Sequence, residues 1–367
     1  MENRSLHDEI LNLVNSNTPF TDILIEEGMP IVIDSPKGWV ALDDFDYPPA
    51  TREDMLPILN GIDQQWEKNI SEQGISRPYE LSKWRLRVSA IRASGGTKVT
   101  LSVRRQPKDP IPLRNTGLPL NISTLADASR GLILVSGPTG SGKTTTMASL
   151  LDHINSTRNA HVVTIEDPLE FVHPRKKSVF TQREIGTDVA SFRQGVKDAM
   201  RQKPNVIMIG EIRDAETADI ALLAADSGHL VLASVHANDG SSTISKMLSW
   251  FPEQELKHRS LTLANVLVGI IYQSILPKAD DSGYVLAAET LFNQHRQLAT
   301  FIADPEKRAG LDAYISRRED KASRSIADHL AELVRSKQVS EEAAMKSVQV
   351  HVRAELNQKL TNPGTAR

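Results

Sequence analysis

The segment "GPTGSGKT", Gly137 to Thr144, has the residue types of a phosphate-binding loop. It fits the pattern G-x-x-x-x-G-K-[ST], follows the strand-like run "GLILVS" and opens a helical pattern, which is the context that such a loop needs. Its glycines let backbone N–H groups close around phosphates, Lys143 reaches the β and γ phosphates, and Thr144 supplies a hydroxyl to Mg²⁺. A glycine-rich turn with a chance lysine is the alternative, which the strand-to-helix context disfavours. The predicted binding residues for a nucleoside triphosphate are Gly137, Pro138, Thr139, Gly140, Ser141, Gly142, Lys143, Thr144 and Thr145.

Carboxylates follow two other apolar runs of strand length. In "NVIMIGEIRD", Glu211 stands at the carboxyl end of the run, where ligands of an open α/β sheet collect. In "TIEDPLEFVH", residues 164–173, Glu166, Asp167 and Glu170 surround a proline. A solvated turn is the ordinary interpretation of such a segment. Beside a phosphate-binding loop, however, phosphoryl transfer needs an acidic site, and a cation would relieve the repulsion among three carboxylates.

The elements that would position these residues fall into zones along the 367-residue chain. Residues 1–104 alternate short apolar runs, such as "DILIEEGMPIVID" and "KVTLSVR", with one amphipathic helical stretch, which predicts a small α+β domain. Residues 105–120 lie in a proline-rich stretch and are the expected linker. In residues 121–277, four apolar runs alternate with helical patterns, as in a parallel sheet wrapped by helices. Residues 278–367 are expected to be mainly helical, with a flexible tail.

Composition narrows the function classes. The formal net charge of −3 and the pI near 6.4 give no electrostatic reason for non-specific binding to nucleic acids or anionic membranes. The absence of cysteine excludes disulfides and thiolate metal sites. The start "MENRSLHDEI" lacks the apolar core of a signal peptide, and polar residues interrupt "LTLANVLVGIIYQSIL", the most apolar stretch. These features predict a cytoplasmic protein.

Four motifs together resemble a known family. "GPTGSGKTTT", "TIEDPLEF", "MIGEIRDAETADIAL" and "SGHLVLASVHAND" occur in the order and spacing of the Walker A, Asp box, Walker B and His box of secretion ATPases. These enzymes power type IV pili and type II and type IV secretion, and the chain resembles most the type IV pilus retraction ATPases (PilT). The resemblance is dense over residues 131–252 and thins in residues 1–105, where "WRLRVSAI" is similar to the family's PAS-like domain. It implies a RecA-like P-loop core in a hexameric ring that hydrolyses ATP.

The resemblance also implies roles for individual residues. Glu170 would orient or activate the attacking water, while Glu166 and Asp167 would hold metal-bound water and the loop geometry. Glu211 would be the Walker B acid, with Glu211 and Asp167 reaching Mg²⁺ through water. His236 would sense the γ phosphate. For His229, a functional role and an ordinary structural one stay equally open.

Arginines are a further requirement, because guanidinium groups stabilise a transition state rich in negative charge. Arg87 and Arg104 match the family's pattern best. Charged residues on a sheet are usually solvated surface, and that interpretation holds for Arg92 and Arg105. In the core domain, the residues open to structural or subunit-contact roles are Arg201 and Arg213.

The sequence departs from two branches of the family, and these differences indicate which machine the chain would serve. The assembly ATPases of pilus and type II systems usually carry a four-cysteine zinc element, so a chain without cysteine favours retraction. Yet "QHRQLATFIAD" stands where retraction motors carry an "AIRNLIRE"-type segment, and "TDILI" replaces their "SDLHL"-like element. An accessory retraction ATPase, a conjugative or effector-secretion ATPase and a non-hydrolysing regulatory subunit therefore stay open. The acidic balance disfavours a nucleic-acid translocase.

The partners that the resemblance implies are five further copies of the same chain, in a homo-hexamer, and an inner-membrane platform protein of the pilus or secretion apparatus. Contact with that platform would place the protein at the inner face of the cytoplasmic membrane, with no specific nucleic-acid partner.

Overall fold

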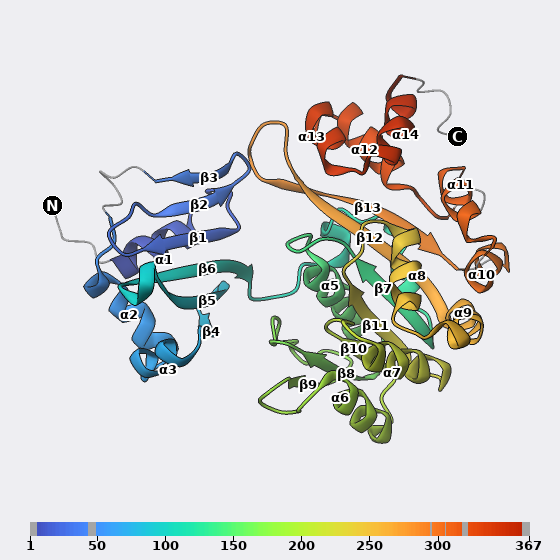
Figure 1. The fold of residues 1–367 in the computed structure, drawn as a ribbon, viewed down its shortest axis with the longest axis horizontal. Helices are drawn as coiled ribbons and strands as arrows, with labels where there is room; N and C mark the ends of the chain where they lie inside the picture. Colours follow the sequence, from blue (N-terminus) through green and yellow to red (C-terminus); the bar gives the residue numbers. More distant parts are fainter. Residues whose placement is uncertain (1–5, 43–48, 294–295, 305, 318–321, 362–367) are drawn as a thin grey trace. The chain divides into compact units, whose positions relative to one another are not determined.

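The computed structural model describes residues 6–42, 49–293, 296–304, 306–317 and 322–361. The chain forms two compact units (Figure 1). The smaller unit comprises Met1–Asp109 and Pro277–Tyr284, and the larger one comprises Pro110–Leu276 and Val285–Arg367. The final tail residues, 362–367, and the first two residues of "QHRQLATFIAD" lie outside the described residues.

The smaller unit has a six-stranded antiparallel sheet in the order β3-β2-β1-β6-β5-β4. Its helices α1, α2 and α3 and the sheet share one hydrophobic core, which confirms the α+β prediction for this zone. In β5 and β6, residues that point into this core alternate with residues on the other face, as the period of two requires. The strands are β1 (Asp22–Glu26), β2 (Val32–Ser35), β3 (Gly38–Ala41), β4 (Ile75–Glu80), β5 (Trp84–Ala93) and β6 (Lys98–Pro107), and the helices are α1 (Leu6–Asn15), α2 (Arg52–Ile62) and α3 (Trp66–Glu72).

The larger unit has a seven-stranded sheet in the order β13-β12-β7-β11-β10-β8-β9. From β12 to β9 every neighbouring pair is parallel. The four predicted apolar runs form β7, β8, β10 and β11, and burial on both faces explains why they read as continuous apolar runs. The strands are β7 (Gly131–Ser136), β8 (His161–Glu166), β9 (Val179–Glu184), β10 (Val206–Ile209), β11 (Leu230–Val235), β12 (Leu267–Pro277) and β13 (Tyr284–Phe292).

Helices cover both faces of this sheet. Alternate residues of β7 show the division, because Leu132 and Leu134 join one core cluster while Ile133 and Val135 join another. The first cluster includes side chains of α6 to α11, and the second includes side chains of α4 and α5. The helices are α4 (Ser123–Ala126), α5 (Lys143–Thr157), α6 (Phe192–Ala199), α7 (Ala215–Asp226), α8 (Gly240–Ser249), α9 (Glu253–Val266), α10 (Arg296–Ala303) and α11 (Leu311–Ser316).

The C-terminal part is helical after one strand that the sequence did not predict. β13 lies within residues 278–367, a region expected to be mainly helical, and its second half is buried. Beyond it, α12 (Ile326–Arg335), α13 (Glu341–Ser347) and α14 (Val350–Thr361) pack against β12 and β13 through a small apolar core. The expected linker also differs at its start, since β6 continues to Pro107.

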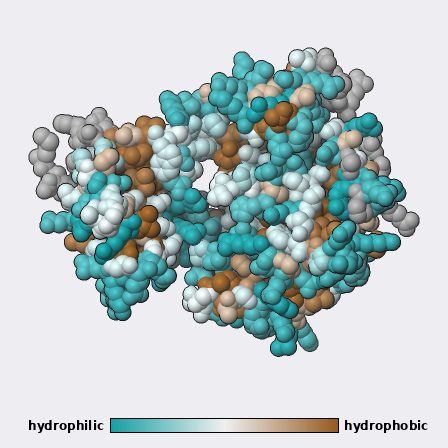
Figure 2. Space-filling view, viewed as in Figure 1, coloured by the Kyte–Doolittle hydropathy of each residue, from teal (hydrophilic) through white to brown (hydrophobic). Residues whose placement is uncertain are grey.

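Among the described residues, the helices are too short or too polar to cross a bilayer. Figure 2 shows that hydrophilic residues cover much of the visible face of the larger unit, with hydrophobic residues in separate patches.

Candidate functional site

The phosphate-binding loop connects the buried strand β7 to α5 in the larger unit. Three glycines in the loop have positive φ angles, 148° at Gly137, 79° at Gly140 and 82° at Gly142. α5 begins at Lys143, and no side chain caps its N-terminus. A helix N-terminus without a side-chain cap presents backbone N–H donors and the positive end of the helix dipole, which suits phosphate.

Lys143 lies over this loop. Its ammonium donates to the carbonyl oxygens of Gly137 at 2.9 Å and Pro138 at 2.8 Å, and lies 3.4 Å from Nδ1 of His236. Burial lowers the pKa of Lys143, while the nearby carboxylates of Glu211 and Glu170 raise it. The structure therefore brings the predicted lysine, histidine and two of the carboxylates together at one end of the sheet.

Gln273 of β12 supports the loop from the neighbouring strand, a role that the sequence did not predict. Its side-chain amide donates to the backbone carbonyl of Ser141 at 2.5 Å. The backbone carbonyl oxygen of Gln273 faces Gly137. A Cβ on Gly137 would collide with that oxygen, so the loop needs glycine there. Gln273 and the loop are far apart in the sequence, so no local pattern predicts this contact.

Gly137→Ala is expected to lower the free energy of unfolding by about 2 kcal/mol or more, because overpacking adds to backbone strain. Gly140→Ala is the matched control, since its φ is also positive but a Cβ there meets nothing within 4 Å. Strain alone predicts a loss of about 1 kcal/mol for the control. Equal losses of melting temperature in the two nucleotide-free variants would contradict the close approach of Gln273.

A chain of polar contacts runs from Lys143 through His236 to Glu211, the carboxylate that follows β10. Nε2 of His236 lies 3.1 Å from one carboxylate oxygen of Glu211, and Arg213 lies 2.8 Å from the other. Arg213 also lies 3.6 Å from Asp167, which follows β8. Because β8 and β10 are adjacent parallel strands, their carboxyl ends place Asp167 and Glu211 beside each other. Arg213, for which a structural or subunit-contact role was open, belongs to this cluster.

Glu166 is the buried member of the three clustered carboxylates. It accepts hydrogen bonds from the Thr164 hydroxyl at 2.7 Å and from the backbone N–H of Glu170 at 3.4 Å. Burial raises the pKa of Glu166 to about 7, although these hydrogen bonds lower it. The contacts tie Glu166 to the geometry of the loop that carries Glu170.

This burial predicts a pH-dependent stability. Between the usual glutamate pKa of 4.5 and about 7, folded Glu166 keeps a proton that the unfolded chain releases. The stability contributed by this group is therefore complete below pH 4.5 and is lost as the pH rises through 7. As the pH rises across this window, the free energy of unfolding of Glu166→Gln is expected to increase by roughly 3 kcal/mol relative to that of the parent. Melting temperatures from pH 4.5 to 8 measure the difference, and parallel curves for variant and parent would contradict it.

Two side chains of β9 hold the loop that follows β8 and carries Glu170, and neither role was predicted. The carboxylate of Glu184 accepts from the N–H of Leu169 at 3.0 Å. The amide of Gln182 donates to the carbonyl of Phe171 at 2.7 Å and accepts from the N–H of His173 at 3.0 Å. With Glu166, these residues fix the backbone on both sides of Glu170, whose side chain is half-buried. The polar run "TQRE" was the only local signal.

The structure separates the two histidines of the His box. His236 follows the carboxyl end of β11, beside the phosphate-binding loop. His229 precedes the other end of this strand, and its Nδ1 lies 3.0 Å from the carbonyl of Ala224. Six strand residues span roughly 20 Å. Within one chain, His229 therefore lies at the opposite edge of the sheet from His236, and its role stays open.

The predicted arginines Arg87 and Arg104 are cross-strand neighbours on the smaller unit's sheet. Arg104 forms an ion pair with Asp22 at 2.8 Å, and Arg87 donates to the Ser76 hydroxyl at 3.3 Å. Both lie on the face away from the core.

The other arginines considered are structural or exposed. Arg105 is half-buried, donates to the carbonyls of Val14, Thr18 and Phe20, and stacks on the Phe20 ring. It is a structural residue, whereas the sequence indicated solvated surface. Arg92 and Arg201 are exposed.

The residues present fit Mg²⁺ bound mainly through phosphate. Among the described residues, no group of three or more histidine and carboxylate side chains is arranged to hold a metal ion by itself. Both carboxylate oxygens of Glu211 already contact His236 or Arg213. Mg²⁺ usually takes substrate phosphates, one or two protein oxygens and several waters, so the Thr144 hydroxyl and water-mediated carboxylates suffice.

Comparisons with known proteins identify the family of this chain. The family model described as "Type II/IV secretion system protein" matches residues 73–366. The chain belongs to this family. A twitching motility protein of Neisseria gonorrhoeae is 31% identical over 308 residues, which cover 83% of this chain and 81% of that protein. The type IV pilus retraction ATPase PilT of Pseudomonas aeruginosa is 38% identical over 207 residues, covering 56% of this chain and 59% of that protein.

Solved structures of the family share the fold. The crystal structure of the pilus retraction motor PilT with bound ADP matches with a TM-score of 0.78 and 30% identity, covering 94% of this chain and 97% of that one. The ATPase DotB of Legionella pneumophila matches with a TM-score of 0.81 and 25% identity, covering 92% and 94%. The predicted family and the predicted α/β ATPase fold are therefore confirmed.

Proposed function

We propose that this protein is a hexameric ATPase motor that drives retraction of a type IV pilus. The observation that carries this proposal is the continuous contact from Lys143 through His236 to Glu211, beside the braced loop that presents Glu170. Relatives named for pilus retraction and twitching motility support the assignment to a retraction motor.

In this mechanism each group acts on a different part of the nucleotide. The N-terminus of α5 and the N–H groups of residues 137–145 bind the phosphates, and Lys143 moves from the loop carbonyls to the β and γ phosphates. Mg²⁺, when bound, would neutralise phosphate charge beside Thr144, with Glu211 and Asp167 holding its waters.

The remaining groups act at the γ phosphate. Glu170 orients the attacking water, and its fixed backbone holds the carboxylate in place. His236, which contacts both Lys143 and Glu211, senses the γ phosphate. In the assembled ring, Arg87 and Arg104 supply positive charge to the transition state.

The motor acts at the inner face of the cytoplasmic membrane through a protein partner. This location follows from the proposed role, in which an inner-membrane platform protein receives the motion. A related secretion or conjugation machine is the second candidate, because "QHRQLATFIAD" and "TDILI" depart from the retraction pattern.

Two measurements test the proposal. ATP hydrolysis by the purified chain, with and without single-stranded DNA, is expected to be Mg²⁺-dependent and insensitive to the DNA. Expression in a bacterium that lacks its own retraction ATPase is then expected to restore twitching, whereas a Lys143→Ala chain is not. Hydrolysis without restored twitching would favour the secretion candidate, and no hydrolysis would favour a regulatory subunit.

A further inference from the structure

Glu289 is a buried carboxyl on β13 that lies between two helix N-termini. One of its oxygens accepts from the N–H of Gly240 at 2.7 Å, and the other accepts from the N–H of Ile326 at 3.3 Å. Gly240 is the first residue of α8 and Ile326 the first of α12. A single side chain therefore satisfies N–H groups that both helices would otherwise leave without a backbone partner.

On one side, this contact lies close to the nucleotide site. α8 begins four residues after His236, and the Thr243 hydroxyl in its first turn donates to Ser136 at 2.7 Å. Ser136 is the last residue of β7, directly before the phosphate-binding loop. A Cβ on Gly240 would lie 2.5 Å from the Glu289 carboxylate, so a larger residue there would displace that carboxylate.

On the other side, the contact fixes the start of α12 to β13. Thr290 and Arg324 exchange backbone hydrogen bonds of 2.9 and 2.8 Å, and the N–H of Ala288 donates to Nδ1 of His329 at 3.0 Å. Glu289 lies between these attachments. These hydrogen bonds hold the beginning of α12 against β13.

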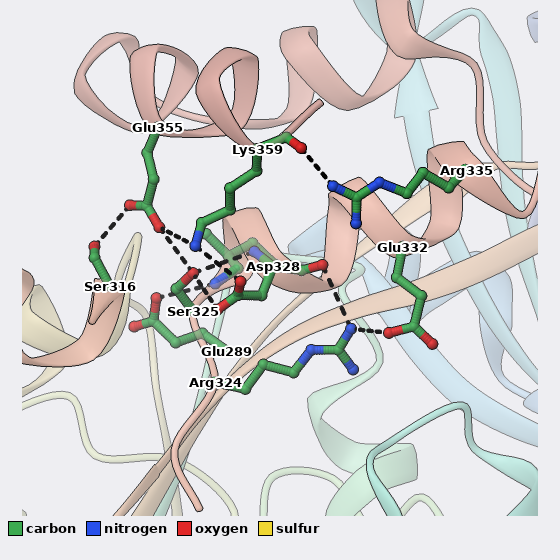
Figure 3. Close-up of polar contacts among 10 residues, drawn as sticks. Glu289, Ser316, Arg324, Ser325, Asp328, Glu332, Arg335, Glu355 and Lys359 are labelled. Carbon is green, nitrogen blue, oxygen red and sulfur yellow. Dashed lines mark hydrogen bonds and ion pairs between the residues drawn. The ribbon is translucent and has the colours of Figure 1, made fainter. Parts of the chain in front are cut away.

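Polar contacts carry the connection onward to α14, as Figure 3 shows. Ser325, which caps α12, donates to Glu355 of α14 at 3.0 Å. Lys359 of α14 forms an ion pair with Asp328 of α12 at 2.8 Å. These polar contacts tie α14 to the start of α12.

The burial of Glu289 is energetically unfavourable, which argues against a role in packing alone. The pKa of Glu289 is raised to about 8, mainly by burial and in part by the carboxylates of Asp239 and Asp312, although the hydrogen bonds from Gly240 and Ile326 lower it. An apolar residue of similar size would avoid this penalty. The buried carboxyl instead accepts hydrogen bonds from two helices at once.

We propose that Glu289 is a positioning residue that couples the C-terminal helices α12 and α14 to the γ-phosphate side of the nucleotide site, through α8 and His236. The inference rests on the proposed ATP hydrolysis. A shift of His236 on contact with the γ phosphate moves the first turn of α8, and the two hydrogen bonds of Glu289 pass that movement to α12. In the reverse direction, a partner bound to the C-terminal helices changes the position of His236.

Glu289→Gln in the full chain tests this coupling. The amide keeps one acceptor but turns an NH₂ group toward the other N–H donor, so one of the two hydrogen bonds is lost. The expected result is a kcat about tenfold lower, with a KM for ATP within twofold of the parent. Glu342→Gln is the matched control, because it makes the same chemical change at an exposed residue of α13 that none of these contacts involves, and its kcat is expected to stay within twofold.

A double-mutant cycle with His236→Ala separates coupling from general loss of structure. If Glu289 acts through His236, Glu289→Gln has no further effect on kcat in the His236→Ala background. If the double variant instead shows the product of the two single effects on kcat, the inference is overturned. A kcat of Glu289→Gln equal to that of the parent overturns it too. A His236→Ala variant with parent kcat overturns it as well.

If Glu289→Gln does not fold, Glu289→Asp takes its place in the same cycle, because aspartate keeps the carboxyl group but is too short to reach both helices. The proposed function fails separately: in that case the parent chain itself does not hydrolyse ATP. An active parent with an unaffected Glu289 variant removes only the coupling.

Discussion

Lys143→Ala is expected to reduce steady-state ATP hydrolysis by tenfold or more while the fold stays intact. The ammonium is buried over the phosphate-binding loop, where it would meet the β and γ phosphates. Loss of one charge-assisted contact of roughly 1.5 to 3 kcal/mol corresponds to at least a tenfold effect. The variant also breaks the contact with His236, so the fall in rate is expected to exceed the fall in nucleotide affinity.

Lys197→Ala is the control for this variant, since Lys197 is an exposed lysine on α6. Its hydrolysis rate is expected to equal that of the parent. Steady-state rates and equilibrium binding of a fluorescent ATP analogue measure both effects. A Lys143→Ala rate within twofold of the parent would show that this loop does not bind the triphosphate in the proposed way.

The parallel core was predictable because its strands are buried on both faces. β7, β8, β10 and β11 appear in the sequence as unbroken apolar runs bounded by glycine or polar residues. β9 has no such run, because its Gln182 and Glu184 are used to hold the loop around Glu170. An edge strand whose polar side chains bind a neighbouring loop looks like a loop itself.

β13 illustrates a second limit of sequence patterns. Its segment "VLAAETLF" is rich in alanine, leucine and glutamate, which favour helices. In the structure, packing between α8 and α12 outweighs that preference, and Glu289 becomes an acceptor for two helix N-termini. Both contacts of Glu289 join it to segments far away in the sequence, 49 residues before it and 37 residues after it, so no local pattern reveals them.

The candidate site was predictable for those side chains that lie within a recognisable sequence motif. The loop with Lys143, the acids after β8 and β10, and His236 all follow the carboxyl ends of parallel strands, so they meet at one edge. Gln273 and Gln182 were missed, because their roles depend on contacts across the sheet. His229 shows the reverse case, since it belongs to the same motif as His236 but lies at the other end of β11.

Glu170→Gln is expected to leave ATP and Mg²⁺ binding unchanged and to slow the chemical step by about 100-fold or more. The substitution keeps the shape of the side chain but removes the charge that orients or activates water, a contribution of roughly 10²- to 10⁴-fold. Glu166, Gln182 and Glu184 hold the surrounding backbone, so the loop is expected to stay in place. The variant is therefore expected to trap bound ATP.

Glu211→Gln is expected to behave differently, because both oxygens of Glu211 have partners in the site. One contacts His236 and the other contacts Arg213, which also contacts Asp167. Loss of that charge releases both partners and weakens the water-mediated hold on Mg²⁺. The Mg²⁺ concentration for half-maximal rate is expected to rise together with the fall in rate, whereas Glu170→Gln leaves that concentration unchanged.

Single-turnover hydrolysis over a Mg²⁺ titration, with binding of a fluorescent ATP analogue, decides between these roles. Glu216→Gln is the matched control, since it makes the same chemical change at an exposed residue of α7 and is expected to leave both quantities at parent values. If Glu170→Gln hydrolyses ATP at nearly the parent rate, residues 164–173 only shape the loop. The water-activating base is then Glu211, whose variant would lose the chemical step even at saturating Mg²⁺, and the bracing of the loop by β9 would serve stability alone.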